Sequence, residues 1–184
     1  MTSDASEPNR GPSLPPTTSE SLENPLDFIQ EDHQREREIC ETLEHLAGAT
    51  VPDEHQVNRV LGFLGEGLPL HLEDEELDLF PLVRRRCEPE DEIERAIERL
   101  SQDHRHTRAD ISDVVAVLRE LGCEGKAITG DERSVLSRYA ANTRRHLMLE
   151  NAVILPFARL RLTAADLETL RLRMLQRRGL DRSS

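Results

Sequence analysis

The chain has 184 residues, enough for one ordinary domain with a sizeable core plus a tail. Charged residues make up 33% and aromatic residues only 3%, a composition that favours a helical protein over a β-sandwich. The net charge of −12 argues against nucleic acid as a partner, because phosphate binding needs a basic face.

The first predicted helix follows a polar N-terminal segment. Residues 1–24 are rich in Ser, Thr, Pro and Glu. Such a segment buries too little apolar area to offset its ordering entropy, so we expect it to be disordered. From Pro25 on, apolar residues recur at helical spacing and predict a helix over about 25–47, followed by a loop over 48–53.

The second predicted helix covers about 54–86 and contains residues that disfavour a regular helix. Gly65, Gly67 and Pro69 interrupt its apolar pattern. Proline lacks the backbone N–H of a helical residue, and its ring clashes with the preceding turn. We therefore expect a kink at this place, or two abutting helices.

Two further long helices complete the predicted set. The third should start near Pro89, with acidic residues in its first turn that favour the helix dipole, and should end at Gly122. The fourth should cover about 131–160. Four long amphipathic helices with short connections fold most simply as an up-down antiparallel bundle, so we predict an all-α protein.

A short fifth helix is predicted after the bundle. Thr163 followed by Asp166 has the spacing of a variant capping box. The expected organisation is therefore a disordered tail over 1–24, a four-helix bundle over 25–160, and a C-terminal helix within 161–184 that packs on the bundle.

The cysteines and the apolar runs bear on location. Cys40, Cys87 and Cys123 are widely spaced and form no CxxC pair, which favours reduced thiols in a cytoplasmic protein. The N-terminus lacks a signal-peptide pattern, and no apolar run approaches membrane-spanning length. We expect a soluble cytoplasmic protein with no membrane partner.

Four of the seven histidines lie on the predicted apolar faces, one on each long helix. A single histidine there is usually a core residue with a hydrogen-bond partner. Four of them, one per helix, favour a common ligand set instead. These residues are His33, His71, His104 and His146.

Two glutamates share these faces. Glu75 lies four residues after His71, and Glu150 lies four residues after His146. Residues at this spacing lie one turn apart on the same side of a helix, so both side chains can reach one point. A buried carboxylate should be protonated, paired with Arg or bound to a metal, and the repeated His-xxx-Glu pattern favours the metal.

The pattern occurs twice along the chain. Residues 32–35 resemble residues 103–106, and residues 71–82 align with residues 146–157, with Glu four after His and Pro six after Glu in both copies. Each half therefore contributes one histidine and one His-xxx-Glu pair. Two helix hairpins related by a pseudo-twofold axis would bring these six residues together as a two-metal site.

This pattern resembles the hemerythrin-like (HHE cation-binding) family over about residues 25–160. The resemblance implies a bundle with two iron ions (Fe2+/Fe3+), bridged by both glutamates and by an oxo or hydroxo group, with two histidines on each iron. Imidazole and carboxylate ligands suit non-haem iron. The implied metal ligands are His33, His71, Glu75, His104, His146 and Glu150.

One position departs from this resemblance. Oxygen-carrying hemerythrins have a second histidine four residues after the third-helix histidine, where this chain has Arg108. The implied iron site is one imidazole short and more open. His106 should face away from that site, and we expect it to be a surface residue, like His45 and His55.

Other polar residues near these positions allow two interpretations. Tyr139 is either a core residue or a hydrogen-bond donor or extra ligand beside the metals. The acidic cluster that surrounds Glu75 is expected to face solvent, with Asp74 as a candidate partner of an imidazole. This cluster consists of Glu73, Asp74, Glu76 and Asp78.

The resemblance leaves several functions open. Ferritin-like oxidases use Glu-xx-His pairs, and no histidine here has a glutamate three residues before it. The first option is binding, sensing or storage of O2, NO or iron at an open site, and the second is an enzyme that degrades peroxide or performs another oxidation. Iron-sulfur cluster repair is weaker, because relatives with that role carry an N-terminal cysteine-bearing domain and no cysteine precedes Cys40. The expected partner is a small diatomic or peroxide ligand, and a homodimer is left open.

Overall fold

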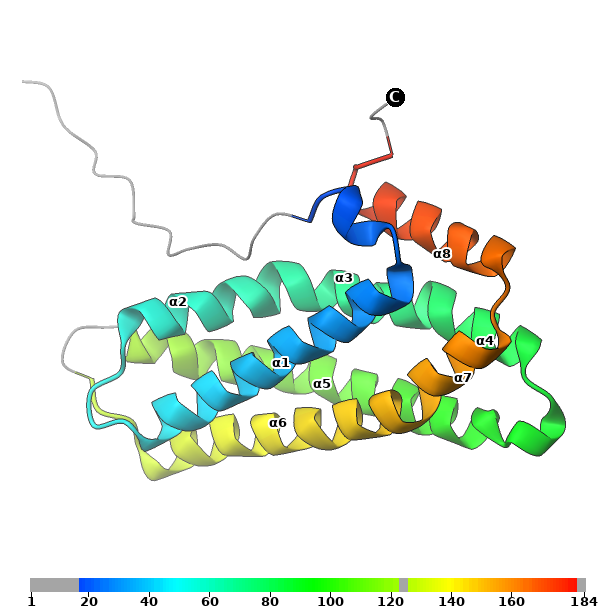
Figure 1. Ribbon diagram of the computed structural model, residues 1–184. Helices are drawn as coiled ribbons and strands as arrows, with labels where there is room; N and C mark the ends of the chain where they lie inside the picture. The colour runs from blue at the N-terminus through cyan, green and yellow to red at the C-terminus, as the bar shows by residue number, and fades with distance from the viewer. Residues whose placement is uncertain (1–16, 123–125, 182–184) are drawn as a thin grey trace, which may run out of the picture.

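A computed structural model describes residues 17–122 and 126–181, and every regular element in these ranges is helical. The four long rods run alternately up and down, as Figure 1 shows, which confirms the all-α bundle. The elements are η1 (Glu20–Leu22), α1 (Pro25–Gly48), α2 (Glu54–Gly62), η2 (Phe63–Gly67), α3 (Leu68–Glu73), η3 (Asp74–Leu79), α4 (Phe80–Arg86), η4 (Pro89–Asp91), α5 (Ile93–Leu121), α6 (Gly130–Leu149), η5 (Glu150–Ile154), α7 (Leu155–Arg161) and α8 (Ala164–Arg177).

The second and fourth rods are assembled from several of these elements. Residues 54–86 form one continuous helical rod from α2 to α4, and residues 130–161 form another from α6 to α7. Of the two expected alternatives, a kink or two abutting helices, the separation into two helices is therefore wrong. Where that break was expected, the backbone widens into the π-helical turn η2 and then continues.

Prolines explain the wide turns. In the described chain, the three π-helical turns η2, η3 and η5 are each followed by a proline at the second position of the next α-helix. A proline inside a regular α-helix loses one hydrogen bond and clashes with the carbonyl four residues earlier. A π-helical turn shifts the hydrogen-bond register of the helix, so the rod continues through Pro69, Pro81 and Pro156.

The helix ends follow local capping rules. Asn24 caps α1 by accepting from the backbone N–H of Asp27, and Thr163 forms the predicted capping box with Asp166 at the start of α8. The third rod begins later than predicted. Residues 89–91 form the 3-10 turn η4, and Glu92 has a φ of 50°, so α5 starts only after this left-handed residue.

The N-terminal segment is ordered earlier than predicted. Residues 1–16 lie outside the described part of the chain. Residues 20–22 form η1, however, and the Leu22 side chain is fully buried against the bundle. The expected boundary of the disordered tail at residue 24 is therefore wrong, because an apolar side chain before Pro25 finds a place in the core.

α8 lies across one end of the bundle, over η1, α1 and η3, as Figure 1 shows. Ion pairs hold it in place. Arg85 and Arg86 of α4 both bind Asp166 at the start of α8, at 2.5 and 2.7 Å. α8 thereby covers the segment that carries Glu75.

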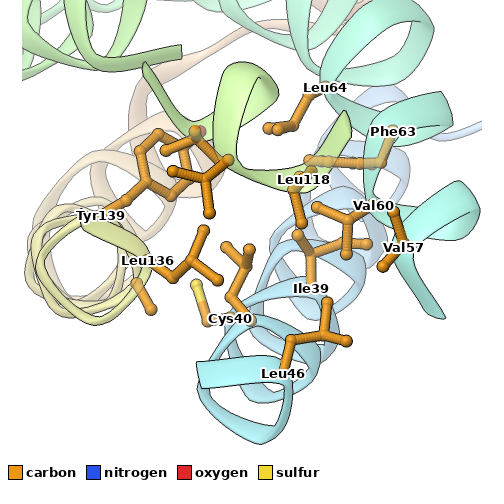
Figure 2. Packing of buried hydrophobic residues seen from close by; sticks show 14 of the residues in the cluster. Ile39, Cys40, Leu46, Val57, Val60, Phe63, Leu64, Leu118, Leu136 and Tyr139 are labelled. Carbon is orange, nitrogen blue, oxygen red and sulfur yellow. The ribbon is translucent and has the colours of Figure 1, made fainter. Parts of the chain in front are cut away.

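Two apolar clusters fill the bundle, one towards each end. The first includes Ile39, Leu118 and Tyr139, and Figure 2 shows its packing. The second includes Leu22, Ile97 and Leu170. On three rods the predicted histidine lies between residues of the two clusters, and on the second rod Glu75 does so, one turn after His71. A layer of polar side chains is therefore enclosed by apolar packing on both sides.

Two other expectations concern location. Among the described helices, none is long and apolar enough to cross a membrane. Cys40 and Cys87 are free thiols, the first of them buried, and Cys123 lies outside the described residues.

Candidate metal centre

The six predicted ligands come together in the polar layer between the two apolar clusters. They form two groups of four, and within each group the potential ligand atoms all lie within 4.8 Å of one another. Both glutamates belong to both groups. The groups are His33, His71, Glu75 and Glu150, and Glu75, His104, His146 and Glu150.

Glu75 contacts three of the four imidazoles. Its Oε1 atom lies 3.1 Å from Nε2 of His33 and 3.5 Å from Nε2 of His71. Its Oε2 atom lies 3.4 Å from Nε2 of His104. The two oxygens therefore face imidazoles of different groups.

Glu150 has the matching position from the fourth rod. Its Oε2 atom lies 3.3 Å from Nε2 of His33 and 3.1 Å from Nε2 of His146. Its Oε1 atom lies 3.9 Å from Nε2 of His104. The Nε2 atoms of His104 and His146 are 3.0 Å apart.

The six side chains are almost fully enclosed, with His146 the most exposed at 6%. Several of their inward-facing atoms lack a hydrogen bond of normal geometry to any described residue, namely Nε2 of His71, Oε2 of Glu75 and both carboxylate oxygens of Glu150. Buried polar atoms are ordinarily satisfied. These unsatisfied nitrogen and oxygen donors fit a metal ion, and their imidazole and carboxylate chemistry suits iron.

Two outward-facing imidazole nitrogens have close polar neighbours from the opposite half of the chain. Nδ1 of His104 lies 2.8 Å from Oε1 of Glu76, and Nδ1 of His33 lies 3.0 Å from the amide nitrogen of Asn151. Glu76 directly follows Glu75, and Asn151 directly follows Glu150. The pseudo-twofold relation thus extends beyond the six predicted ligands to the residues that orient them.

The other two imidazoles have aspartate neighbours at longer distances. Nδ1 of His71 lies 3.9 Å from Oδ2 of Asp32, and Nδ1 of His146 lies 3.9 Å from Oδ2 of Asp103. Each aspartate directly precedes the histidine of its own helix in the repeated Asp-His sequence. All four imidazoles are therefore flanked by polar groups on the side away from the centre.

Arg108, at the position that departs from oxygen-carrying hemerythrins, lies outside the centre. Its guanidinium donates to both carboxylate oxygens of Glu76, at 2.8 and 3.0 Å. Although partial burial works against ionisation, hydrogen bonds from His104 and Arg108 lower the pKa of Glu76 to about 2. Arg108 therefore acts on the His104 imidazole through Glu76.

The expectation that the acidic cluster around Glu75 faces solvent is wrong for two of its four members, whereas Glu73 is exposed and Glu76 is partly buried. Asp74 and Asp78 are almost fully buried. Arginines of α8 neutralise them: Arg178 binds Asp74 at 2.5 Å, Arg177 binds Asp78 at 2.6 Å, and Arg173 binds Asp78 at 2.7 Å. Glu76, and not Asp74, contacts an imidazole. These roles depend on where α8 docks, and the local sequence carries no signal for that.

Glu36 was not predicted. Its side chain is 4% exposed, and its Oε1 atom lies 3.0 Å from Nε2 of His71. Its position three residues after His33 places it on the same face of α1. That spacing is the one signal in the sequence that could have identified Glu36.

The charges of the centre depend on one another. Burial works against a charged imidazole, but the neighbouring carboxylates outweigh it and raise the pKa of His33 and of His71, and that of His104 to about 9. Burial likewise works against an ionised Glu75, but the nearby His71 imidazolium lowers the pKa of Glu75 well below its usual range. Without metal, imidazolium–carboxylate pairs therefore hold the polar layer together.

Tyr139 packs in the apolar cluster shown in Figure 2 and is 4% exposed. Burial raises the pKa of its phenol, which keeps the hydroxyl protonated, and Thr143 is its hydrogen-bond partner. Tyr139, Thr143 and His146 line a cavity of about 100 Å³ between α5 and α6. His106 also lines this cavity and is exposed, as predicted, and so are His45 and His55.

Comparison with known proteins agrees with this geometry. The chain is 23% identical over 143 residues to an uncharacterised protein of Haemophilus influenzae, an alignment that covers 74% of this chain and 80% of the relative. The profile of the hemerythrin HHE cation binding domain matches residues 24–158, a span that contains the six predicted ligands. On this match the chain belongs to the hemerythrin HHE cation-binding domain family.

Proposed function

We propose that the protein binds two iron ions in the polar layer and uses them to bind a small ligand such as O2, NO or peroxide. The observation that carries this proposal is the pair of four-ligand groups that share Glu75 and Glu150. Two shared carboxylates suit two adjacent ions better than one. Iron held there would supply redox chemistry and coordination positions for a small ligand.

The chain's own residues have separate roles in this proposal. Glu75 and Glu150 would bridge the two ions, and the four imidazoles would hold them in pairs. Glu76 orients the ring of His104, and the apolar clusters on both sides restrict the access of water. The cavity beside His146 is large enough for several water-sized molecules, so it supports entry of a small ligand.

Peroxide breakdown is the second candidate. It needs a proton source near the reacting oxygen atoms. The imidazole of His106 lines the cavity beside His146 and could supply protons there, and the hydroxyl groups of Tyr139 and Thr143 could donate hydrogen bonds. This cavity lining is the observation that favours an enzyme.

Anaerobic reconstitution with ferrous iron tests both candidates. We expect two irons per chain in the wild type and in His55→Ala, the control with an exposed histidine removed, and fewer in His146→Ala. Exposure to O2, NO and peroxide with recorded spectra then distinguishes the functions. A reversible adduct supports binding, and catalytic loss of peroxide supports the enzyme. A wild type that holds one ion or none would overturn the proposal.

A further inference from the structure

Glu36 is a buried carboxylate that the six-ligand pattern does not include. Its Oε1 atom makes no hydrogen bond of normal geometry to any residue in the described part of the chain. This atom lies 3.0 Å from Nε2 of His71. The same Nε2 atom lies 3.5 Å from Oε1 of Glu75, so two carboxylates converge on one ring nitrogen.

This arrangement leaves Glu36 with an incomplete set of partners once a metal binds. An imidazole that gives the Nε2 lone pair to a metal has no proton on that atom to donate. Glu36 would then keep a buried charge beside a neutral ring, which is costly. A metal ion bound by Nε2 of His71 would be a cation beside this carboxylate and would remove this cost, because Oε1 of Glu36 lies 3.0 Å from that Nε2 atom.

At the corresponding position of the other half, the described chain has no carboxylate. The repeated Asp-His sequence pairs His33 with His104, so the counterpart of Glu36 is Thr107, three residues after His104. Thr107 lines the cavity that also reaches His146. The two halves therefore differ at this position: a buried carboxylate occupies one, and a small side chain beside an open cavity occupies the other.

We propose that Glu36 is a further metal ligand, specific to the ion held by His33 and His71. This inference rests on the proposed two-iron function and deepens it. The ion at His33 and His71 is enclosed by an additional protein carboxylate. The ion at His104 and His146 keeps its free coordination for the external ligand, on the side of the cavity. The two ion positions are therefore not equivalent, although the six predicted ligands repeat between the two halves of the chain.

The test uses the full-length chain with Glu36→Gln, which keeps the size of the side chain and removes its charge, and Glu36→Asp, which keeps the charge and withdraws the carboxylate by one methylene. Glu41→Gln, at an exposed position of the same helix, is the control. Anaerobic titration with ferrous iron against a chelator gives the affinity of each of the two sites. Mössbauer spectra of iron-57 protein report the two environments separately.

We expect two distinguishable iron environments in the wild type and in Glu41→Gln. Both Glu36 variants should weaken one of the two irons by about 100-fold or more, since even residues that only orient ligands contribute 10- to 100-fold. They should alter one Mössbauer signal and leave the other unchanged. If Glu36→Gln does not fold, Glu36→Asp decides alone.

The remaining outcomes overturn one claim or both. Wild-type affinity for both irons in both variants, or in Glu36→Asp, shows that Glu36 is not a ligand and leaves the two-iron proposal intact. Equal weakening of both irons shows a general effect and overturns the assignment to one ion. A wild type that fails to bind two irons overturns the proposed function, and the role of Glu36 with it.

Discussion

Nδ1 of His104 lies 2.8 Å from Oε1 of Glu76, a residue that the sequence analysis assigned to the solvent-exposed surface. The contact joins α5 to the π turn η3, and Arg108 holds the same carboxylate from outside. A carboxylate on the far side of a metal-binding imidazole fixes the orientation of the ring and increases its basicity. The residue that replaces a histidine in this chain therefore supports the histidine one turn before it.

Replacing Glu76 by Ala should weaken metal binding at the position of His104 and His146. The imidazole loses its acceptor and Arg108 loses its partner, so we expect a loss of roughly 10- to 100-fold in the affinity of one iron. Titration with ferrous iron measures the loss. Glu66→Ala, at an exposed position of the same rod, is the control and should bind like the wild type. An unchanged affinity in Glu76→Ala would show that the ring needs no such support.

The clustering of the six predicted ligands could be anticipated because the spacing within each His-xxx-Glu pair depends on one helix at a time. His71 and Glu75 face one point whatever the rest of the fold does, and so do His146 and Glu150. Glu76 and Asp74 could not be placed in this way. Which neighbours their side chains meet depends on the π turn that carries them and on the docking of α8, and both are properties of the packed molecule.

The predicted end of the disordered tail at residue 24 was wrong for a related reason. A composition rich in Ser, Thr and Pro describes the average of a segment, whereas one side chain decides whether it docks. Leu22 is the apolar residue that packs under α8, and Asn24 caps α1. The same holds for Pro69: it predicts two separate helices only if the helix stays α-helical, and the rod widens instead.

Replacing Asp74 by Ala should destabilise the protein and reduce its metal retention. Asp74 is fully buried, and its removal leaves the guanidinium groups of Arg177 and Arg178 without their shared partner. Loss of one partner of a buried pair costs about 3–5 kcal/mol. Thermal melting and metal retention check this expectation. The control is Glu73→Ala, which removes the half-exposed neighbouring carboxylate and should change both quantities far less.

Residues 1–16 and Leu22 should contribute very differently to the stability of the protein. We expect deletion of residues 1–16 to leave the melting temperature and the iron content nearly unchanged. Leu22→Ala should lower the free energy of unfolding by about 2–5 kcal/mol, because its side chain is fully buried. Melting curves of both variants measure the difference. A truncation as harmful as Leu22→Ala would contradict the placement of the boundary.

Acid should weaken the docking of α8 through Asp166. Hydrogen bonds from Arg86, together with those from Thr163 and Arg85, hold the pKa of Asp166 well below its usual range. A carboxyl group whose pKa is lower in the folded state contributes stability above its unfolded pKa of about 4, and this contribution is lost as the pH falls below that value. Asp166→Asn should therefore lower the melting temperature at pH 7 by a few degrees and cost progressively less towards pH 3. A difference that is constant across this range would contradict the ion-pair explanation.

Glu75→Gln should weaken the protein both with and without iron, for two different reasons. In the metal-free chain, the nearby His71 imidazolium outweighs burial and lowers the pKa of Glu75, so the carboxylate is ionised and stabilising at neutral pH. Its replacement by an amide leaves His33, His71 and His104 without the negative charge that lies beside all three and should cost roughly 1–3 kcal/mol of the free energy of unfolding. Because the folded pKa is the lower one, this cost should shrink as the pH falls below about 4, where the carboxylate is protonated in the unfolded chain and its contribution to stability is progressively lost.

With iron, the wild type should melt well above its metal-free form, because ligand binding to the native state adds stability. Glu75→Gln should lose most of that increase, since an amide binds metal far less well than a carboxylate. Melting curves with and without ferrous iron, for the wild type, Glu75→Gln and the exposed control Glu66→Gln, give all the required differences. A metal-free Glu75→Gln that is more stable than the wild type would show that burial outweighs the imidazolium partners, and that the metal-free layer is a source of strain relieved only by iron.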